Sequence, residues 1–227
     1  MRASRYSQFC ALARVADIIG ERWTLLIMRE LLLGPKRFGD LGERLKGVSP
    51  TLRTEHLNAL IEFGVVRRAT LAAPFNAQVY ELTEVGRDSQ PAIRELIRWG
   101  GHFLLPMRPD EVFEPDWVLL ALDAIALRRP TPACRIVLRL RHHGGLANFV
   151  VAGGPAGTSI VKGEGPGGAA IETRFDTLLR MLAAELSIDA AIAAKQIEIK
   201  GALRIARKLP RLFDLEERRR GRRSAVS

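Results

Sequence analysis

DIIGERWTLLIMRELLLGPKRFGDL, residues 17–41, is the stretch that decides the fold of this chain. Its central part, from about Arg22 to Leu33, is apolar nearly all round, which predicts a helix in the middle of a core. Gly34-Pro35 ends that helix, because proline lacks the backbone N–H that a helix needs. We expect a short third helix over about Phe38 to Leu45. Apolar residues at three- and four-residue steps predict a first helix over Phe9 to Ile19.

The segment that follows indicates a helix-turn-helix. Gly47 is suited to a left-handed turn, and Ser49-Pro50 combines a capping side chain with a preset backbone angle. The helix that begins there is expected to run to Phe63 and to end at Gly64. Two helices joined by a tight glycine turn are the geometry of this motif.

A hairpin, or wing, is expected next. Val65 to Arg68 and Gln78 to Thr83 have the character of two strands, with a proline-containing loop between them. The loop carries no cation over Leu71 to Phe75, which disfavours a tip that binds DNA through charge. A further helix over about Asp88 to Phe103 completes a winged-helix domain, which we place at residues 1–105.

The same region resembles a known family. Residues 17–41, together with Val48-Ser49-Pro50 and the run YELTEVG at residues 80–86, are similar to the HxlR family of bacterial winged-helix regulators. The likeness covers residues 9 to 104 and consists of many elements in the expected order. It implies a DNA-binding transcriptional regulator that works as a homodimer, whose helix from Ser49 enters the major groove of a double-stranded operator.

The resemblance and the residue types together give a set of candidate DNA contacts. The candidates are Lys36, Arg37, Ser49, Thr51, Arg53, Thr54, Asn58, Arg67 and Arg68. Asn58 could pair with adenine, Ser49 and Thr51 are suited to phosphate, and the four cations outside the helix are suited to phosphate or to simple solvation. Glu55 shares the polar face. The family commonly has other residues at the positions of Arg53, His56 and Asn58. The bases that this helix prefers therefore do not follow from the resemblance.

A second domain is expected over residues 117–213, after a proline-rich, acidic linker at 106–116. Its alternating segments predict an α+β fold. AIETRFDTLLRML at residues 170–182 and QIEIKG at residues 196–201 resemble the sterol carrier protein-like fold. That likeness implies an apolar tunnel and an apolar small-molecule effector, with a solid dimerisation core as the alternative. A lipid-carrying or enzymatic domain controlled by DNA binding is a second alternative. The basic tail, 214–227, is expected to be disordered.

Three smaller features allow two interpretations each. Cys10 lies where some HxlR proteins sense oxidants, but burial as a small apolar residue is the more frequent role of a cysteine. GEGPGG at residues 163–168 has the spacing of a dinucleotide loop, yet a strand follows it, so we expect a flexible hairpin turn. His142 and His143 are adjacent and would point to opposite faces of a strand, which makes a poor metal pair.

Composition limits the class of protein. The 227 residues carry a formal net charge of +10, which fits a polyanionic partner. Two distant cysteines and the lack of a signal peptide or long apolar run predict a soluble, cytoplasmic protein that does not enter membranes. No nucleophile, base and orienting residue can be grouped, so no enzymatic activity, metal or cofactor is expected.

Overall fold

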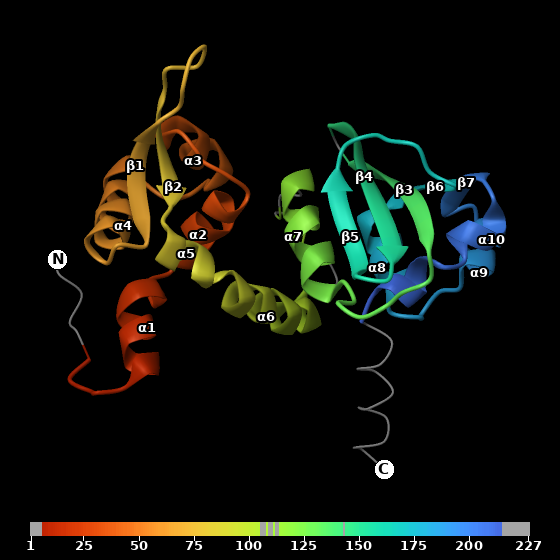
Figure 1. Ribbon diagram of the computed structural model, residues 1–227, viewed down its shortest axis with the longest axis horizontal. Coiled ribbons are helices and arrows are strands. Elements are labelled where there is room, and N and C mark those ends of the chain that lie inside the picture. The colour runs from red at the N-terminus through yellow and green to blue at the C-terminus, as the bar shows by residue number, and fades with distance from the viewer. Residues whose placement is uncertain (1–5, 105–107, 109–110, 112–113, 143, 215–227) are drawn as a thin grey trace. The chain divides into compact units, whose positions relative to one another are not determined.

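The computed structural model describes residues 6–104, 108, 111, 114–142 and 144–214 (Figure 1). The chain divides into two compact units, residues 1–93 and 94–227. This division falls before the boundary expected near residue 105. Most of the expected linker and the tail from residue 215 lie outside the described residues. Within the described ranges, no helix combines the length and the apolar character that crossing a membrane requires.

The first unit has the expected winged-helix order. The hairpin strands are antiparallel, with Arg67 opposite Glu81 and Arg68 opposite Tyr80. Figure 1 shows the loop between β1 and β2 projecting beyond the helices of this unit. Its elements are α1 (Ala11–Ile19), α2 (Thr24–Leu32), α3 (Phe38–Arg44), α4 (Pro50–Glu62), β1 (Val66–Thr70), β2 (Gln78–Leu82) and α5 (Glu84–Asp88), followed by the start of α6 (Gln90–Gly100).

The helix expected over about Asp88 to Phe103 is confirmed as α6 with the 3-10 turn that follows it. A short separate helix, α5, precedes it, because the chain turns at Ser89. That residue ends α5, and its Oγ donates a hydrogen bond of 2.6 Å to the carbonyl oxygen of Gly86. Pro91 then lies in the first turn of α6, where its missing N–H costs no helical hydrogen bond. A short 3-10 turn, Gly101–Phe103, follows α6.

The second unit is built on one mixed sheet with the strand order β5-β4-β3-β6-β7. Only β3 and β6 are parallel; the other neighbours are antiparallel. This arrangement confirms the α+β class expected for this part of the chain. Its elements are α7 (Pro115–Ile125), β3 (Cys134–His142), β4 (Gly145–Gly154), β5 (Gly157–Lys162), β6 (Ala169–Arg174), α8 (Phe175–Leu182), α9 (Ile188–Ala193), β7 (Ile197–Gly201), α10 (Leu203–Ala206) and the 3-10 turn η2 (Leu209–Leu212).

One side of this sheet forms a closed apolar core with the helices. Leu138 of β3 and Phe149 of β4 are fully buried, as are Leu122 of α7 and Met181 of α8. These side chains fill the centre of the second unit. Along β6, buried residues alternate with more accessible ones, as the two-residue repeat of a strand requires. In β3, the three consecutive residues Ile136, Val137 and Leu138 are all buried.

The glycine-rich segment at residues 163–168 is not the expected hairpin turn. It leaves β5 at the edge of the sheet and enters β6 on the far side of β4 and β3, so it crosses between strands that are not neighbours. A side-chain carbon on Gly168 would overlap Cδ1 of Ile205, and one on Gly167 would lie 3.0 Å from Cγ2 of Val137. Close packing therefore explains Gly167 and Gly168, whereas Gly163 has a φ of 127°, a left-handed angle that favours glycine.

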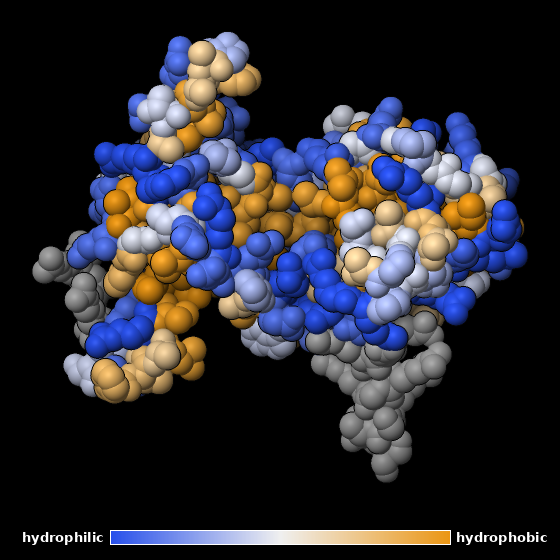
Figure 2. Space-filling view, in the orientation of Figure 1, coloured by the Kyte–Doolittle hydropathy of each residue, from blue (hydrophilic) through white to orange (hydrophobic). Residues whose placement is uncertain are grey.

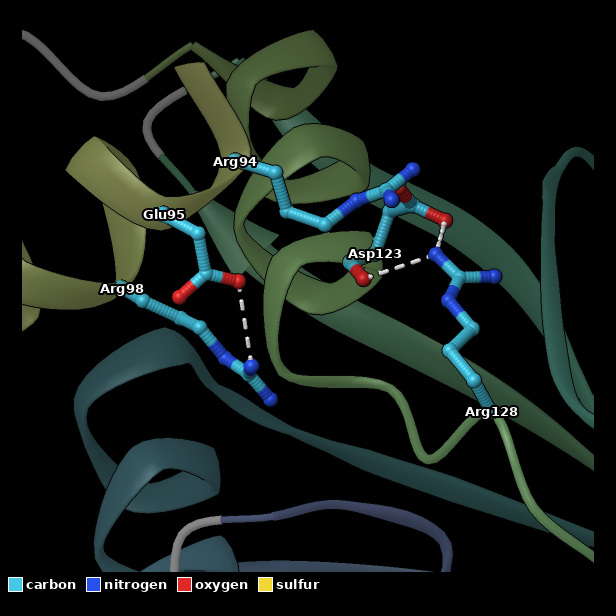
Figure 3. A network of polar contacts seen from close by, with 5 residues as sticks. All are labelled: Arg94, Glu95, Arg98, Asp123 and Arg128. Carbon is cyan, nitrogen blue, oxygen red and sulfur yellow. Dashed lines mark hydrogen bonds and ion pairs between the residues drawn. The ribbon is translucent and has the colours of Figure 1, made fainter. Parts of the chain in front are cut away.

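Ion pairs attach the later part of α6 to the second unit. Arg94 lies 3.0 Å from Asp123 of α7, and Arg98 lies 2.7 Å from Asp214. Figure 3 shows Arg94 and Arg98 extending from α6, and it marks the bond between Asp123 and Arg128. These contacts account for the boundary after Ile93, well before the sequence-based estimate.

Candidate nucleic-acid interface

The turn between α3 and α4 is set by local chemistry. Gly47 has a φ of 96°, a left-handed angle that residues with side chains rarely adopt. Leu45 and Val48 on either side of it are buried and anchor the turn. Ser49 caps α4, because its Oγ accepts a hydrogen bond of 3.2 Å from the backbone N–H of Leu52. The orientation of α4 is thus fixed at its first residue.

α4 has a buried side and a polar, exposed side. Leu57 and Leu60 are each 1% exposed and belong to the core of the first unit. Thr51, Thr54 and Asn58 are exposed, as is the neighbouring Glu55. Because a helix repeats every 3.6 residues, these side chains form one outward row. The structure therefore brings together the polar residues that the sequence analysis placed toward DNA.

The expectation that Arg53 contacts DNA is wrong. Its side chain is on the inner side of α4 and is only 6% exposed, so it is not available to a ligand at the surface. The guanidinium carbon lies 4.1 Å from the centre of the Phe38 ring, a cation–π stack between α4 and α3. The next inner position is polar as well: Nδ1 of His56 lies 3.3 Å from Oγ1 of Thr24 in α2. Arg53 is therefore a packing residue.

The two wing cations have different surroundings. Arg67 is paired with Glu81 across the hairpin at 2.6 Å, so its charge is largely balanced. Arg68 lies over the ring of Tyr80 and donates a hydrogen bond of 3.3 Å to Oδ1 of Asn58. The latter bond joins the wing to the exposed row of α4. One continuous polar surface results.

The cations before α3 lie next to the wing. Lys36 is tied to the second wing strand by two backbone hydrogen bonds with Tyr80, of 3.0 and 2.8 Å. Arg37 precedes α3, and its backbone N–H donates a hydrogen bond of 3.0 Å to Oδ2 of Asp40. The side chain of Arg37 is exposed. The sequence analysis missed Lys46, which is exposed in the turn before α4. The position of Lys46 in that turn could have identified it as a candidate DNA contact.

Cys10 is exposed, so the expectation that it is buried is wrong. It directly precedes α1, at the positive end of the helix dipole. The backbone N–H groups of Ala13 and Leu12 lower the pKa of its thiol. A larger share of this thiol is consequently ionised near neutral pH than in an ordinary cysteine.

The comparisons with known proteins concern the region that holds this surface. The family model described as HxlR-like helix-turn-helix matches residues 18–107. YodB, an HTH-type transcriptional regulator of Bacillus subtilis, is 33% identical over 90 residues, which are 40% of this chain and 80% of YodB. The chain belongs to the HxlR-like family. The matched region is the helix-turn-helix part of the chain.

Other relatives cover the same part. An HTH-type transcriptional regulator of Mycobacterium tuberculosis is 40% identical over 94 residues, which span 41% of this chain and 59% of that relative. Among solved structures, reduced YodB is 30% identical with a TM-score of 0.38, over 44% of this chain and all of that one. The reduced redox regulator HypR is 25% identical with a TM-score of 0.38, over 41% of this chain and 92% of that one.

The cations of this surface lead to a prediction about how DNA binding depends on salt. We expect Arg68→Ala to weaken binding to all duplex sequences alike, because a phosphate contact carries no sequence information. The log–log dependence of affinity on salt should become shallower by about 0.9 for one lost contact. Affinities measured by fluorescence anisotropy across a salt series check this. Lys36→Ala and Arg37→Ala should behave in the same way.

Arg204→Ala is the matched control, because it removes the same charge from an exposed position of α10 in the second unit. Its salt slope should equal that of the unchanged protein. A loss confined to one duplex sequence would mean that Arg68 reads bases.

Proposed function

We propose that this regulator binds a specific operator with α4 in the major groove and the wing on the adjoining backbone. The exposed row of Thr51, Thr54 and Asn58, opposite a buried helix side, carries this proposal. An α-helix with its side chains is about 10–12 Å across, and the major groove is about 12 Å wide, so α4 fits. Asn58 is suited to adenine, and Glu55 can accept a bond from cytosine.

Homodimerisation is the second part of the proposal. Leu12 on α1 is 74% exposed, and Trp99 on α6 is 62% exposed. Other exposed apolar side chains lie near them in the chain, namely Phe9, Val15, Leu96 and Phe103. Exposed apolar side chains on helices favour association with a second copy of the chain, which removes them from water. A two-fold dimer presents two copies of α4, which predicts an operator with two related half-sites.

Selection from a randomised duplex library with the full chain tests both parts. We expect recovered sequences with two inverted half-sites whose centres lie about 10 base pairs, or a multiple of that, apart. Thr54→Ala combined with Asn58→Ala should reduce discrimination between selected and random duplexes by about 1–3 kcal/mol per lost base contact. Anisotropy titrations against both kinds of duplex measure this difference.

Ser159→Ala supplies the control, because this exposed polar residue belongs to β5 of the second unit. Unchanged discrimination by a folded double variant would refute the assignment of α4 as the reading helix. Selected sequences without any inverted repeat would argue against the dimer.

We further propose the sterol carrier protein-like identity for the second unit, with an apolar effector that acts through it. Support comes from the sequence likeness and from the large apolar cluster enclosed by α7, α8 and the sheet. That cluster is closed, so a ligand has to displace core side chains such as Met181, a flexible residue suited to repacking. A shallow depression on this unit has a volume of only about 10 Å³, and its lining residues are Arg139, Ala170, Glu172, Glu198 and Lys200.

Oleate is a suitable probe for the effector. Titration of the full chain with oleate, with and without the selected duplex, should change DNA affinity about 5–150-fold, and duplex should change oleate affinity by the same factor. Equal oleate binding with and without duplex would instead identify the second unit as a lipid carrier. No binding at all would leave its solid core as a structural or dimerisation element.

Thiol sensing by Cys10 is a second candidate function. Its exposure and its lowered pKa favour reaction with oxidants and electrophiles. α1 also carries the exposed Leu12, so a modification at Cys10 would lie close to the surface proposed for dimerisation. A reaction there would alter DNA binding through the dimer.

The lowered pKa predicts the pH dependence of this reaction. The thiolate is the reacting form, so the alkylation rate of Cys10 by iodoacetamide should reach half its maximum below the pH found for free cysteine. Rates are measured by mass spectrometry in the Cys134→Ser variant, where Cys10 is the only thiol. Alkylation should change operator affinity in that variant and leave Cys10→Ser unaffected. A midpoint equal to that of free cysteine would contradict the idea.

A further inference from the structure

The tip of the wing is apolar and exposed. Residues 71–77 read LAAPFNA and contain no charged side chain. Phe75 is 67% exposed and is the largest side chain of the tip. Figure 1 shows this loop extending away from the first unit, and Figure 2 shows orange and tan atoms in it. A large aromatic ring is thus presented to solvent at the end of an arm.

Hydrogen bonds fix the loop that carries this ring. The N–H of Leu71 donates to the carbonyl of Ala77 at 2.9 Å, and the N–H of Phe75 donates to the carbonyl of Ala72 at 3.2 Å. At the base of the loop, the side chain of Gln78 donates to Oγ1 of Thr70 at 2.8 Å. A phenyl ring has only two rotatable bonds, so little side-chain entropy is lost when it is buried. The tip is organised in advance for a partner.

The position of the wing tip relative to α4 indicates that its partner is DNA. Arg68 of β1 contacts Asn58 in the exposed row of α4. Leu71 lies three residues beyond Arg68, or about 10 Å along the strand direction. With α4 in the major groove, β1 reaches the phosphate backbone of the DNA at Arg68. The minor groove lies on the other side of that backbone. An uncharged tip at that distance is suited to the groove floor.

We propose that the wing tip inserts Phe75 into the minor groove beside the half-site read by α4, as an apolar wedge that partly opens one base step. This inference rests on the proposed function, since it assumes α4 in the major groove. Apolar wedges of this kind unstack a step and bend the duplex toward the major groove. Flexible pyrimidine–purine steps yield most easily, so the wedge adds sequence preference without hydrogen bonds to bases.

The proposed contact of Phe75 differs from that of Arg68 in its dependence on salt. Arg68 acts on phosphate, so its effect depends on salt. Phe75 gains affinity by removing apolar surface from water, which releases no counterions. The cations Lys36, Arg37 and Arg68 precede the tip on the same unit, and they match the charge of nucleic acid better than that of an apolar protein surface.

The test uses the full chain and the duplex that the unchanged protein selects. Phe75→Ala removes the wedge, and Phe75→Leu keeps an apolar side chain. Val85→Ala is the matched control, because Val85 is 65% exposed on α5 of the same unit. The duplex carries 2-aminopurine at single positions flanking the half-site, so that its fluorescence reports unstacking. Circularly permuted fragments report bending on native gels.

We expect Phe75→Ala to bind about tenfold more weakly, with an unchanged salt slope. The 2-aminopurine signal at one flanking step and the bend, expected at about 20–90°, should both decrease. Phe75→Leu should keep most of the bend, and Val85→Ala should match the unchanged protein.

Two results would overturn the wedge while the proposed function stands. One is full bending and unstacking by Phe75→Ala. The other is a change in the sedimentation of the DNA-free Phe75→Ala protein, which would mark the tip as a protein contact. Failure of the unchanged protein to select any duplex would refute the proposed function itself, and the wedge with it.

Discussion

The inner side of α4 holds this helix in the first unit through Leu57 and Leu60, which are almost fully buried. Because the helix repeats every 3.6 residues, burying one side fixes which residues face outward. The Ser49 cap sets where the helix begins, and the Arg68–Asn58 hydrogen bond aligns the wing with the outward row. Each proposed DNA contact, including that of Phe75, depends on this one packing constraint.

The net charge of +10 overstates the number of cations available to DNA. Arg53 stacks on Phe38 inside the first unit, and Arg67 is balanced by Glu81 on the wing. In the second unit, Arg141 bonds two glutamates across the sheet, which raises the pKa of its guanidinium. Exposed ion pairs of this kind contribute little stability, but they reduce the charge that a phosphate meets.

The two units contribute different kinds of surface. The first presents an exposed polar row and an apolar wing tip, whereas the second encloses its apolar residues beneath one side of a mixed sheet. YodB matches about 40% of the chain, and the family match ends at residue 107, so most of the second unit lies outside the region shared with these relatives. Ion pairs of Arg94 and Arg98 attach the end of α6 to that second unit.

Local sequence signals determined the winged helix: Ser49-Pro50 marked the start of α4, and its apolar repeat separated Leu57 from Asn58. The alternating runs located most strands of both units. Tertiary structure alone placed Arg53 in the interior, opened Cys10 to solvent and carried residues 163–168 across the sheet. Helix and strand periods depend on neighbours along the chain, whereas burial and strand order depend on residues brought together from distant segments.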